Sequence, residues 1–301
     1  MTKLVDLLKL YNLSHDEICH TVIMAHTEKQ EKKKSLGKNI TAYDLWRSDF
    51  DNRGDNQHDR DLDTEWEFFN RTHNKNALKE HKFLLSFVEI PITKDIIFTG
   101  FYKIIGSKPV KKGAVHPVQK IPMEGKEENI LEYDQRLKEL EGKLVGSWNI
   151  TQNIKRLLYD KSKKKYKENL FVKAILQEIP EHEFSYQSFL WSTDRISKLP
   201  NSWQNHLSQL FGVYLLVDGR GKQYVGSAYS RDGGFLSRWK QYEKTGHGGN
   251  KQLRKLTKEQ QVYTVSILET APSSYTKNQV IKLESKWKNK LGTRAHGLNS
   301  N

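Results

Sequence analysis

Two tyrosines in the last third of the chain are the residues best placed to do chemistry. Tyr214 ends a Gly-Val-Tyr run, and Tyr224 begins a Tyr-Val-Gly run ten residues later. The pair Asp218-Gly219 between them is a strong signal for a tight turn, so residues 211–228 are expected to form an antiparallel hairpin. Neighbouring side chains on one face of a hairpin lie roughly 5 Å apart. The two phenols could therefore meet at one place on the surface.

The segments that follow the hairpin carry further candidates. Apolar residues at helical spacing predict a helix over 235–244, and Arg238 and Tyr242 then share one face because they stand four residues apart. A later helix is expected around Glu284, which lies at the polar edge of an apolar stripe. The chain closes with a Leu-Asn pair at Asn299. These elements must position the tyrosines and their partners.

This order of elements resembles the GIY-YIG nuclease superfamily over residues 211–299. The match comprises Gly-Val-Tyr, Tyr-Val-Gly-Ser, an Arg-x-x-x-Tyr helix, a later helix with Glu and the final Leu-Asn. The intervals after the second tyrosine are similar to those of the restriction-enzyme branch. The catalytic set that the resemblance implies is Tyr214, Tyr224, Arg238, Tyr242, Glu284 and Asn299, with Asn289 as the rival of Asn299.

The chemistry implied by this resemblance is phosphodiester hydrolysis. That reaction needs a water nucleophile, a group that takes its proton, a cation facing the developing charge and help for the leaving oxygen. Glu284 would hold Mg²⁺, with Mn²⁺ as a substitute, because this ion keeps several waters and needs few protein ligands. Arg238 would offer its charged fork to the scissile phosphate.

The family pattern makes Tyr214 the general base or the group that orients water. A phenol with a pKa of about 10 is a poor base, so the basic residues Lys222, Lys240 or Arg238 would have to lower the pKa of Tyr214. The other two phenols would orient water or shuttle protons. Taken singly, a strand tyrosine is more often a half-buried packing residue, and a helix arginine or glutamate a solvated one.

The charge distribution favours a nucleic-acid substrate. The chain carries a net charge of +14, and residues 201–301 hold 16 Lys and Arg against 6 Asp and Glu. A polyanion is expected to dock on this basic segment. The candidate DNA contacts are Lys222, Lys240, His247, Asn250, Lys251, Arg254 and Lys255, with Lys258, Lys282, Lys286, Lys288 and Lys290 as further basic positions. Alternatively, 247–250 is a loop in which Asn250 caps the next helix.

The length of 301 residues predicts about two domains. We expect an N-terminal helical segment over 1–40, an α+β domain that reads DNA over 41–200 and the nuclease domain over 201–301. The single cysteine, Cys19, excludes an internal disulfide and fits a reducing cytoplasm. No apolar run approaches the roughly 20 residues of a membrane span. The expected location is the cytoplasm, without a membrane partner.

The expected fold class is α+β throughout. The nuclease domain should hold a small antiparallel sheet of about three strands flanked by helices. Strand-like segments upstream predict a small β-barrel or a curled sheet. The predicted strands are 83–88, 96–105, 144–150 and 170–175; the predicted helices are two within 3–30 (with a capping box at Ser14 and Glu17), 128–140 and 184–199; and 161–167 is a basic hairpin tip.

The upstream domain is a candidate reader of sequence or of a modified base. Readers of modified bases flip the base into an aromatic pocket. The available aromatic residues, which are more often core, are Trp46, Trp66, Phe69, Phe101, Tyr102 and Trp148. We therefore expect a metal-dependent endonuclease of double-stranded DNA that acts in restriction or anti-phage defence, with a second copy of the chain as a candidate partner in a homodimer. The alternatives are a structure-specific repair or recombination nuclease and a non-catalytic nucleic-acid-binding module.

Overall fold

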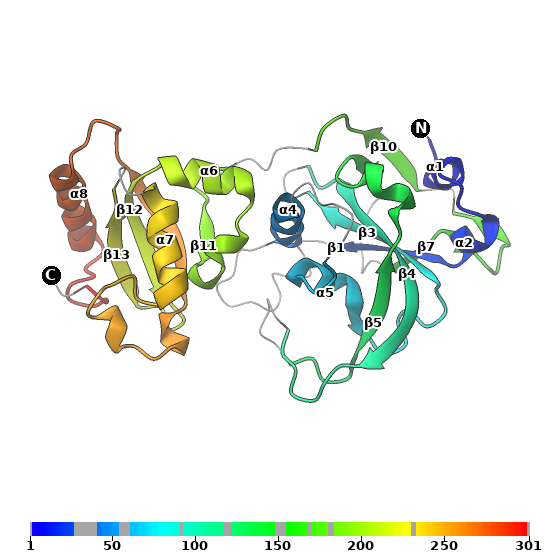
Figure 1. Cartoon of the computed structure of the whole chain (residues 1–301), viewed down its shortest axis with the longest axis horizontal. Coiled ribbons are helices and arrows are strands. Elements are labelled where there is room, and N and C mark those ends of the chain that lie inside the picture. Colours follow the sequence, from blue (N-terminus) through cyan, green and yellow to red (C-terminus); the bar gives the residue numbers. More distant parts are fainter. Residues whose placement is uncertain are drawn as a thin grey trace. The chain divides into compact units, whose positions relative to one another are not determined.

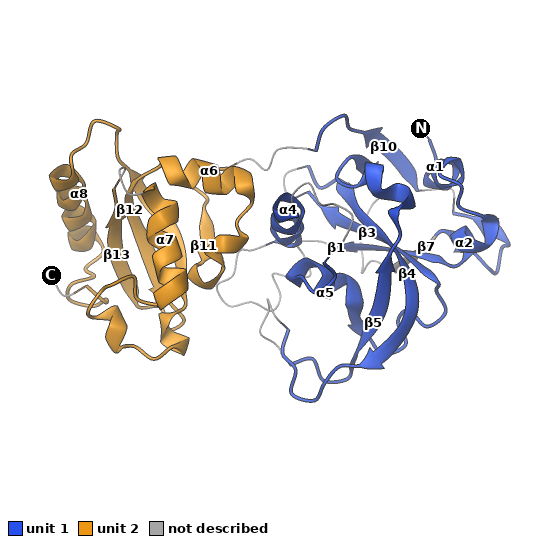
Figure 2. Ribbon diagram, in the orientation of Figure 1, with its two compact units in different colours: residues 1–35, 41–180 blue, residues 36–40, 181–301 orange. Residues whose placement is uncertain are grey.

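The computed structural model describes residues 2–26, 41–53, 61–90, 93–116, 122–147, 155–167, 170–179, 184–229 and 233–299. The chain folds into two compact units (Figure 2). Unit 1 comprises Met1–Ser35 and Thr41–Pro180, and unit 2 comprises Leu36–Ile40 and Glu181–Asn301. The described strands form sheets of eight, four and two members alongside helices, which confirms the α+β class.

Unit 1 begins with two short helices, as the sequence predicts. α1 spans Leu4–Leu10 and α2 spans His15–Cys19, and the expected capping box at Ser14 starts the second helix. The helical prediction fails after α2, because Thr21–His26 is strand β1. β1 pairs along its whole length with a strand about sixty residues later, and this distant pairing overrides any local helical preference. Residues 27–40 lie outside the described part of the chain.

The core of unit 1 is one mixed sheet (Figure 1). Four of its strands lie where the sequence predicts strands: β3 (Phe83–Glu89), β4 (Ile96–Pro109), β6 (Leu144–Ser147) and β10 (Phe171–Ile175). The others are β1, β2 (Thr72–Asn74), β5 (Lys126–Tyr133) and β7 (Lys155–Leu157). β1 runs parallel to β3, and the remaining pairs are antiparallel.

The predicted helix over 128–140 is wrong. Lys126–Tyr133 is strand β5, and only Gln135–Leu140 is helical, as the 3-10 helix η1. Burial alternates along β5, with Asn129 and Leu131 buried and Ile130 exposed between them. This period of two is typical of a strand with one covered face, and the charged residues around it conceal the pattern in the sequence.

The described strands of this sheet do not close into a barrel. They run in the order β10-β6-β4-β3-β1-β7, with β5 paired to β4 and β2 paired to β5. Strand β4 pairs with β3 on one side and with both β6 and β5 on the other. The sheet therefore divides into two branches at β4, and its described end strands do not pair with each other as they would in a barrel. The predicted basic hairpin is present as β8 (Tyr159–Asp160) and β9 (Lys165–Tyr166).

The aromatic residues proposed as a base-reading pocket are mostly core. Trp46 lies on helix α4 (Ala42–Asn52), Trp66 lies on α5 (Glu65–Arg71), and both are buried against the sheet. Phe101 and Tyr102 of β4 are buried as well. The bulky rings supply the apolar surface that holds the helices on the sheet. Phe69 is half-buried, and Trp148 lies outside the described residues.

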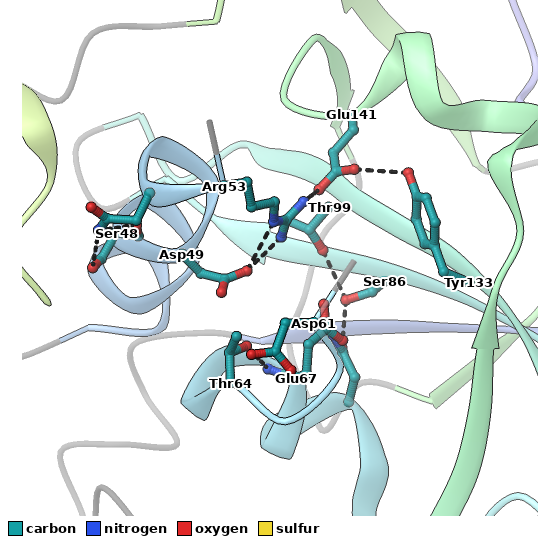
Figure 3. A network of polar contacts seen from close by, with 12 residues as sticks. Ser48, Asp49, Arg53, Asp61, Thr64, Glu67, Ser86, Thr99, Tyr133 and Glu141 are labelled. Carbon is teal, nitrogen blue, oxygen red and sulfur yellow. Dashed lines mark hydrogen bonds and ion pairs between the residues drawn. The ribbon is translucent and has the colours of Figure 1, made fainter. Parts of the chain in front are cut away.

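A buried polar network lies between α4, α5 and the sheet (Figure 3). Its fully buried carboxylate is Glu67, which accepts hydrogen bonds from the Tyr102 hydroxyl at 2.9 Å and from the Asn70 amide at 3.1 Å. Asn70 in turn accepts a hydrogen bond of 2.7 Å from Ser86, and Thr99 donates one of 2.8 Å to Ser86. These groups satisfy one another, as burial of polar atoms requires.

Unit 2 contains the predicted hairpin and the helices predicted over 235–244 and around Glu284. β12 (Gly212–Asp218) and β13 (Gln223–Ala228) are antiparallel, and β14 (Tyr263–Thr270) pairs with the other side of β12. α7 spans Gly234–Thr245, and α8 spans Lys277–Lys290 behind a capping box at Thr276. The 3-10 helices η4 (Leu253–Lys255) and η5 (Glu259–Gln261) precede β14.

The sheet of unit 2 has a fourth strand that the sequence does not reveal. The predicted helix over 184–199 is instead strand β11 (Leu190–Ser192) followed by the 3-10 helix η2 (Thr193–Lys198). β11 pairs with β14, which gives the order β11-β14-β12-β13. Helix α6 (Asn201–Gln209) then leads into β12. Unit 2 therefore starts earlier than residue 201.

Candidate functional site

The candidate site lies at the edge strand β13, where side chains from both faces of the sheet come together. Tyr214 is paired with Gly226 and Leu216 with Tyr224, so both tyrosines share the face that α7 covers. Ser227 lies on the opposite face, toward α8. Because β13 is the last strand of the sheet, groups from the two faces can meet around its free edge.

A cluster of phenols and a guanidinium forms the α7 side of the site. The hydroxyls of Tyr214 and Tyr242 are 2.9 Å apart. Arg238 donates from Nε to Tyr214 at 3.1 Å, from one Nη to Tyr242 at 3.2 Å and from the other to the Gly248 carbonyl at 2.7 Å. The Tyr224 hydroxyl accepts a hydrogen bond of 3.2 Å from Asn250. The guanidinium is therefore held in one orientation.

Two glycines make this cluster possible. A Cβ at Gly226 would lie 2.5 Å from the Tyr214 hydroxyl oxygen, so the ring can lie over the strand only where no side chain is present. Gly248 has a φ of +52° and passes so close to Tyr242 that a Cβ would lie 2.8 Å from its ring. The glycine of the second tripeptide is thus a packing requirement of the first tyrosine.

Burial raises the pKa of Tyr214, which corrects the expectation that cations lower it. The side chain is fully buried, and this desolvation outweighs the opposing effect of the Arg238 charge on the pKa. Burial also raises the pKa of Tyr224, with Glu284 adding to the effect, and raises the pKa of Tyr242. Lys222 and Lys240 are exposed. All three phenols are neutral at neutral pH.

Glu284 forms the α8 side of the site. Its Oε2 accepts a hydrogen bond from the Ser227 hydroxyl, and its Oε1 forms an ion pair of 2.6 Å with Lys288, one helical turn later. Lys288 is only 4% exposed, so it is not one of the DNA contacts to which the sequence assigned it. The i, i+4 spacing and the serine after Gly226 were the available signals for these two partners.

A cavity of about 360 Å³ joins the two sides. Tyr224, Arg238 and Glu284 line it, together with residues of the β13 end and α7. Tyr214 and Tyr242 are bonded to Arg238 but do not line the cavity themselves. The cavity therefore brings a phenol, a guanidinium and a carboxylate to one polar space, from three elements that are separate in sequence.

A single carboxylate is the available metal ligand here. In the described part of the chain no group of three or more His, Cys, Asp or Glu side chains could hold an ion together. Mg²⁺ is compatible with one carboxylate because it retains several waters, and the polar cavity beside Glu284 has room for them. Lys288 forms an ion pair with the same carboxylate, so the net charge of the pair is close to zero before a metal ion binds.

Asn299 clamps the edge of β13. Its Oδ1 accepts from the Val225 N–H and its Nδ2 donates to the Val225 carbonyl, both at 2.9 Å. The side chain thus pairs with the free edge of the strand beside Tyr224 and does not face the cavity. The rival, Asn289, accepts a hydrogen bond from Arg294 instead.

The remaining candidate DNA contacts are of two kinds, exposed basic side chains and residues of the 247–250 loop. Lys222, Lys240, Lys251, Arg254 and Lys255 have exposed side chains. Asn250 caps the turn after it by accepting from the N–H groups of Gln252 and Leu253, while its amide reaches Tyr224. His247 Nδ1 accepts from the Gly249 N–H at 3.0 Å. Asn250 therefore caps the turn that precedes η4, whose own N-cap is Gln252, and the 247–250 loop also supplies the carbonyl that binds Arg238.

No family model, curated protein or solved structure is detectably similar to the chain. Every helix in the described ranges is too short or too polar to cross a membrane.

Proposed function

We propose that the chain is a metal-dependent endonuclease of the GIY-YIG type that hydrolyses phosphodiester bonds of double-stranded DNA. The observation that carries this proposal is the cavity of about 360 Å³ that Tyr224, Arg238 and Glu284 line together. These are the residue types that a phosphodiesterase needs: an orienting hydroxyl, a permanent cation and a metal-binding carboxylate.

Arg238 binds the scissile phosphate in this proposal. Its guanidinium already lines the cavity, and one Nη donates to the exposed Gln241 at 2.8 Å. A phosphate oxygen can replace this solvent-facing partner while Tyr214, Tyr242 and Gly248 keep their bonds. The fork then meets the phosphate in a fixed orientation, which lowers the cost of reorganisation in the transition state.

Glu284 holds the metal ion, and Ser227 and Lys288 keep its carboxylate in place. When bound, Mg²⁺ would supply positive charge beside the phosphate and make a nearby water more acidic. The attacking water would release its proton to solvent in the open cavity, and the leaving oxygen would take a proton from solvent, because the three phenols are neutral and cannot act as the base. The neutral Tyr224 hydroxyl orients water in the cavity by donating and accepting hydrogen bonds. Tyr214 and Tyr242 do not line the cavity, and they orient Arg238 through their hydrogen bonds to it. This role of Tyr214 replaces the general-base role expected from the sequence.

The basic surface supports DNA as the substrate. Residues 201–301 carry 16 Lys and Arg against 6 Asp and Glu, and Lys222, Lys240, Lys251, Arg254 and Lys255 are exposed. Such a surface attracts a polyanion over a distance near the Debye length. We place the activity in restriction or anti-phage defence in the cytoplasm, with two copies of the chain supplying the two cuts that a duplex requires.

The test is cleavage of supercoiled plasmid by the full chain. We expect nicked and linear products with Mg²⁺ or Mn²⁺ and none with EDTA. Glu284→Ala should abolish cleavage, whereas Glu259→Ala, which removes an exposed carboxylate of unit 2 outside the cavity, should cut at the wild-type rate. Cleavage by Glu284→Ala at the wild-type rate would refute the catalytic assignment. Discrete fragments from linear DNA would indicate sequence reading, and preference for forks or flaps would indicate a repair enzyme.

A further inference from the structure

A second cavity, of about 340 Å³, lies in unit 1 beside the basic hairpin β8–β9. It is lined by residues of the hairpin, by residues at the start of α1 and by His15 of α2. The sequence predicts this hairpin as a basic tip, and none of its residues lines the cavity of unit 2. Its cavity combines aromatic rings with lysines, and this combination is the basis of the inference.

Three aromatic rings form one wall of the cavity. His15, Tyr159 and Tyr166 all line it, and their ring centroids are 5.5 to 5.6 Å apart in edge-on pairs. The His15 ring is hydrogen-bonded to the Tyr166 hydroxyl, and the Lys9 ammonium lies 4.7 Å from the Tyr166 ring centroid. The rings therefore hold one another in place, yet His15 is exposed and both tyrosines are only half-buried. They differ in this from the core tryptophans of unit 1.

Lysines form most of the rest of the lining, which also includes Val5. Lys3, Lys164, Lys165 and Lys167 line the cavity, and Asp6 is the one acidic residue among its lining side chains. The hairpin turn that presents these lysines is ordered by Asp160, whose carboxylate accepts from the backbone of Ser162 and Lys163.

The two acidic residues that follow His15 in α2 form ion pairs away from the cavity. Asp16 forms an ion pair with Lys82, and Glu17 forms one with Arg136. Neither carboxylate lines the cavity. The lysines of the lining thus outweigh its acid, and the cavity favours an anionic ligand.

We propose that this cavity binds one unpaired nucleotide of a DNA strand, with the phosphate on the lysines and the base against the aromatic wall. A free phosphate would leave the three rings without a ligand contact, and an apolar ligand would leave the four lysines without one. The backbone of a paired duplex would contact the lysines without entering a cavity. Aromatic faces combined with a positive rim are the usual means of holding unpaired bases. The volume is at the lower end of ligand pockets, which suits a single nucleotide.

This inference rests on the proposed function for its choice of DNA, and its test measures binding without cleavage. The probe is a fluorescein-labelled single strand of twelve thymidines, titrated with the full chain in EDTA and 0.15 M NaCl and followed by anisotropy. The double variant Lys165→Glu/Lys167→Glu changes two exposed lysines of the cavity. Lys111→Glu/Lys112→Glu changes two exposed lysines of unit 1 that do not line it, with the same change in net charge.

We expect the cavity variant to raise Kd roughly tenfold or more and the control pair to raise it less than about threefold. Tyr159→Leu should raise Kd by about fivefold without changing the slope of log Kd against log salt, because a lost stacking partner releases no counterions. Thermal melts establish that each variant is folded, and the exposed lysine pair keeps the test valid if the tyrosine variant unfolds.

Equal weakening by the two lysine pairs would overturn the inference, since it would mean that net charge alone governs binding. An unchanged Kd for folded Tyr159→Leu would overturn the stacking of a base. Absence of plasmid cleavage with Mg²⁺ would contradict the proposed nuclease and leave these binding results as they are. The two failures are therefore distinguishable.

Discussion

Unit 1 and unit 2 each contain a hydrogen-bonded group of tyrosine, arginine and glutamate side chains, but only the group in unit 2 lines one of the two cavities described above. In unit 1, Arg53 joins Asp49 to Glu141, and Tyr133 donates to the same glutamate at 3.0 Å (Figure 3). None of these side chains lines either of the two cavities described above. In unit 2, Arg238 and Glu284 lie at the wall of one.

The difference teaches how to separate a structural network from a candidate site. Glu67 in unit 1 is fully buried, and its carboxylate is bonded to Tyr102 and Asn70 of the same unit. Glu284 in unit 2 is also bonded, to Ser227 and Lys288, but remains in contact with a polar space that can admit water and an ion. A satisfied network stabilises the fold, whereas a group at a cavity wall can act on a ligand.

After Glu284, the largest effect expected from breaking this contrast is at Arg238. Arg238→Lys keeps the charge but loses the fork that reaches Tyr214, Tyr242 and the phosphate, so we expect the cleavage rate to fall about 10²-fold. Arg220→Lys is the matched control, since Arg220 pairs with Asp218 in the hairpin turn and does not line the cavity. Initial rates of plasmid cleavage measure both variants, and equal losses would remove the special role of the cavity.

The network of unit 1 should be sensitive to acid. Burial lowers the pKa of His26 to about 4, so the folded state resists protonation that the unfolded chain accepts near pH 6.5. Stability is complete above pH 6.5 and is lost as the pH falls toward 4, by about 3 kcal/mol in total. His26→Gln cannot gain the proton and should show a flatter profile.

Calorimetric melts at pH 7.0, 5.5 and 4.5 test this expectation. The slope against pH is the decisive quantity, because His26→Gln also loses the contact of the ring with Asn70 at every pH. Wild type and variant with the same acid-induced loss would show that His26 is not the group responsible.

The site of unit 2 should be sensitive to alkali instead. Burial raises the pKa of Tyr214 above that of an unfolded phenol, so its contribution to stability is complete below pH 10 and is lost as the pH rises further. At pH 11 one such phenol costs about 1 kcal/mol. Tyr214→Phe should reduce this alkaline loss, whereas Tyr186→Phe, which changes an exposed tyrosine of unit 2, should not.

Melting temperatures between pH 8 and 11 measure this smaller effect. A Tyr214→Phe profile that superimposes on the wild-type profile would mean that Tyr214 ionises as an unfolded phenol does. The neutral phenol is also the reason for placing Tyr214 behind Arg238 in the proposed mechanism.

The sequence predicted those parts of the fold that depend on local signals. The turn at Asp218-Gly219, the capping box at Ser14 and the helical stripes of α7 and α8 are all determined within a few residues. Strands β1 and β11 were missed because each is defined by pairing with a partner far along the chain, and β5 was missed because charged residues conceal its alternating burial. The branching of the sheet at β4 depends on the same long-range pairings.

The candidate site was predictable in its residue types but not in its electrostatics. Tyr224, Arg238 and Glu284 meet at one cavity, as their order suggested. The direction of the pKa shift of Tyr214 depends on its complete burial, which its position in a hairpin does not reveal. The burial of Lys288 was hidden for the same reason, since a lysine-rich helix predicts a solvated face.

The comparison of the two carboxylates is the most direct test of the account. Glu284→Gln makes an isosteric change at the cavity wall, and Glu67→Gln makes the same change in the buried polar network of unit 1. Each variant is measured for plasmid cleavage with Mg²⁺ and for thermal stability. We predict that Glu284→Gln lowers the cleavage rate by at least about 10³-fold and stays folded. Glu67→Gln should lose about 2 kcal/mol of stability and cut at the wild-type rate. Folded Glu284→Gln that cleaves as fast as the wild type would contradict the central claim.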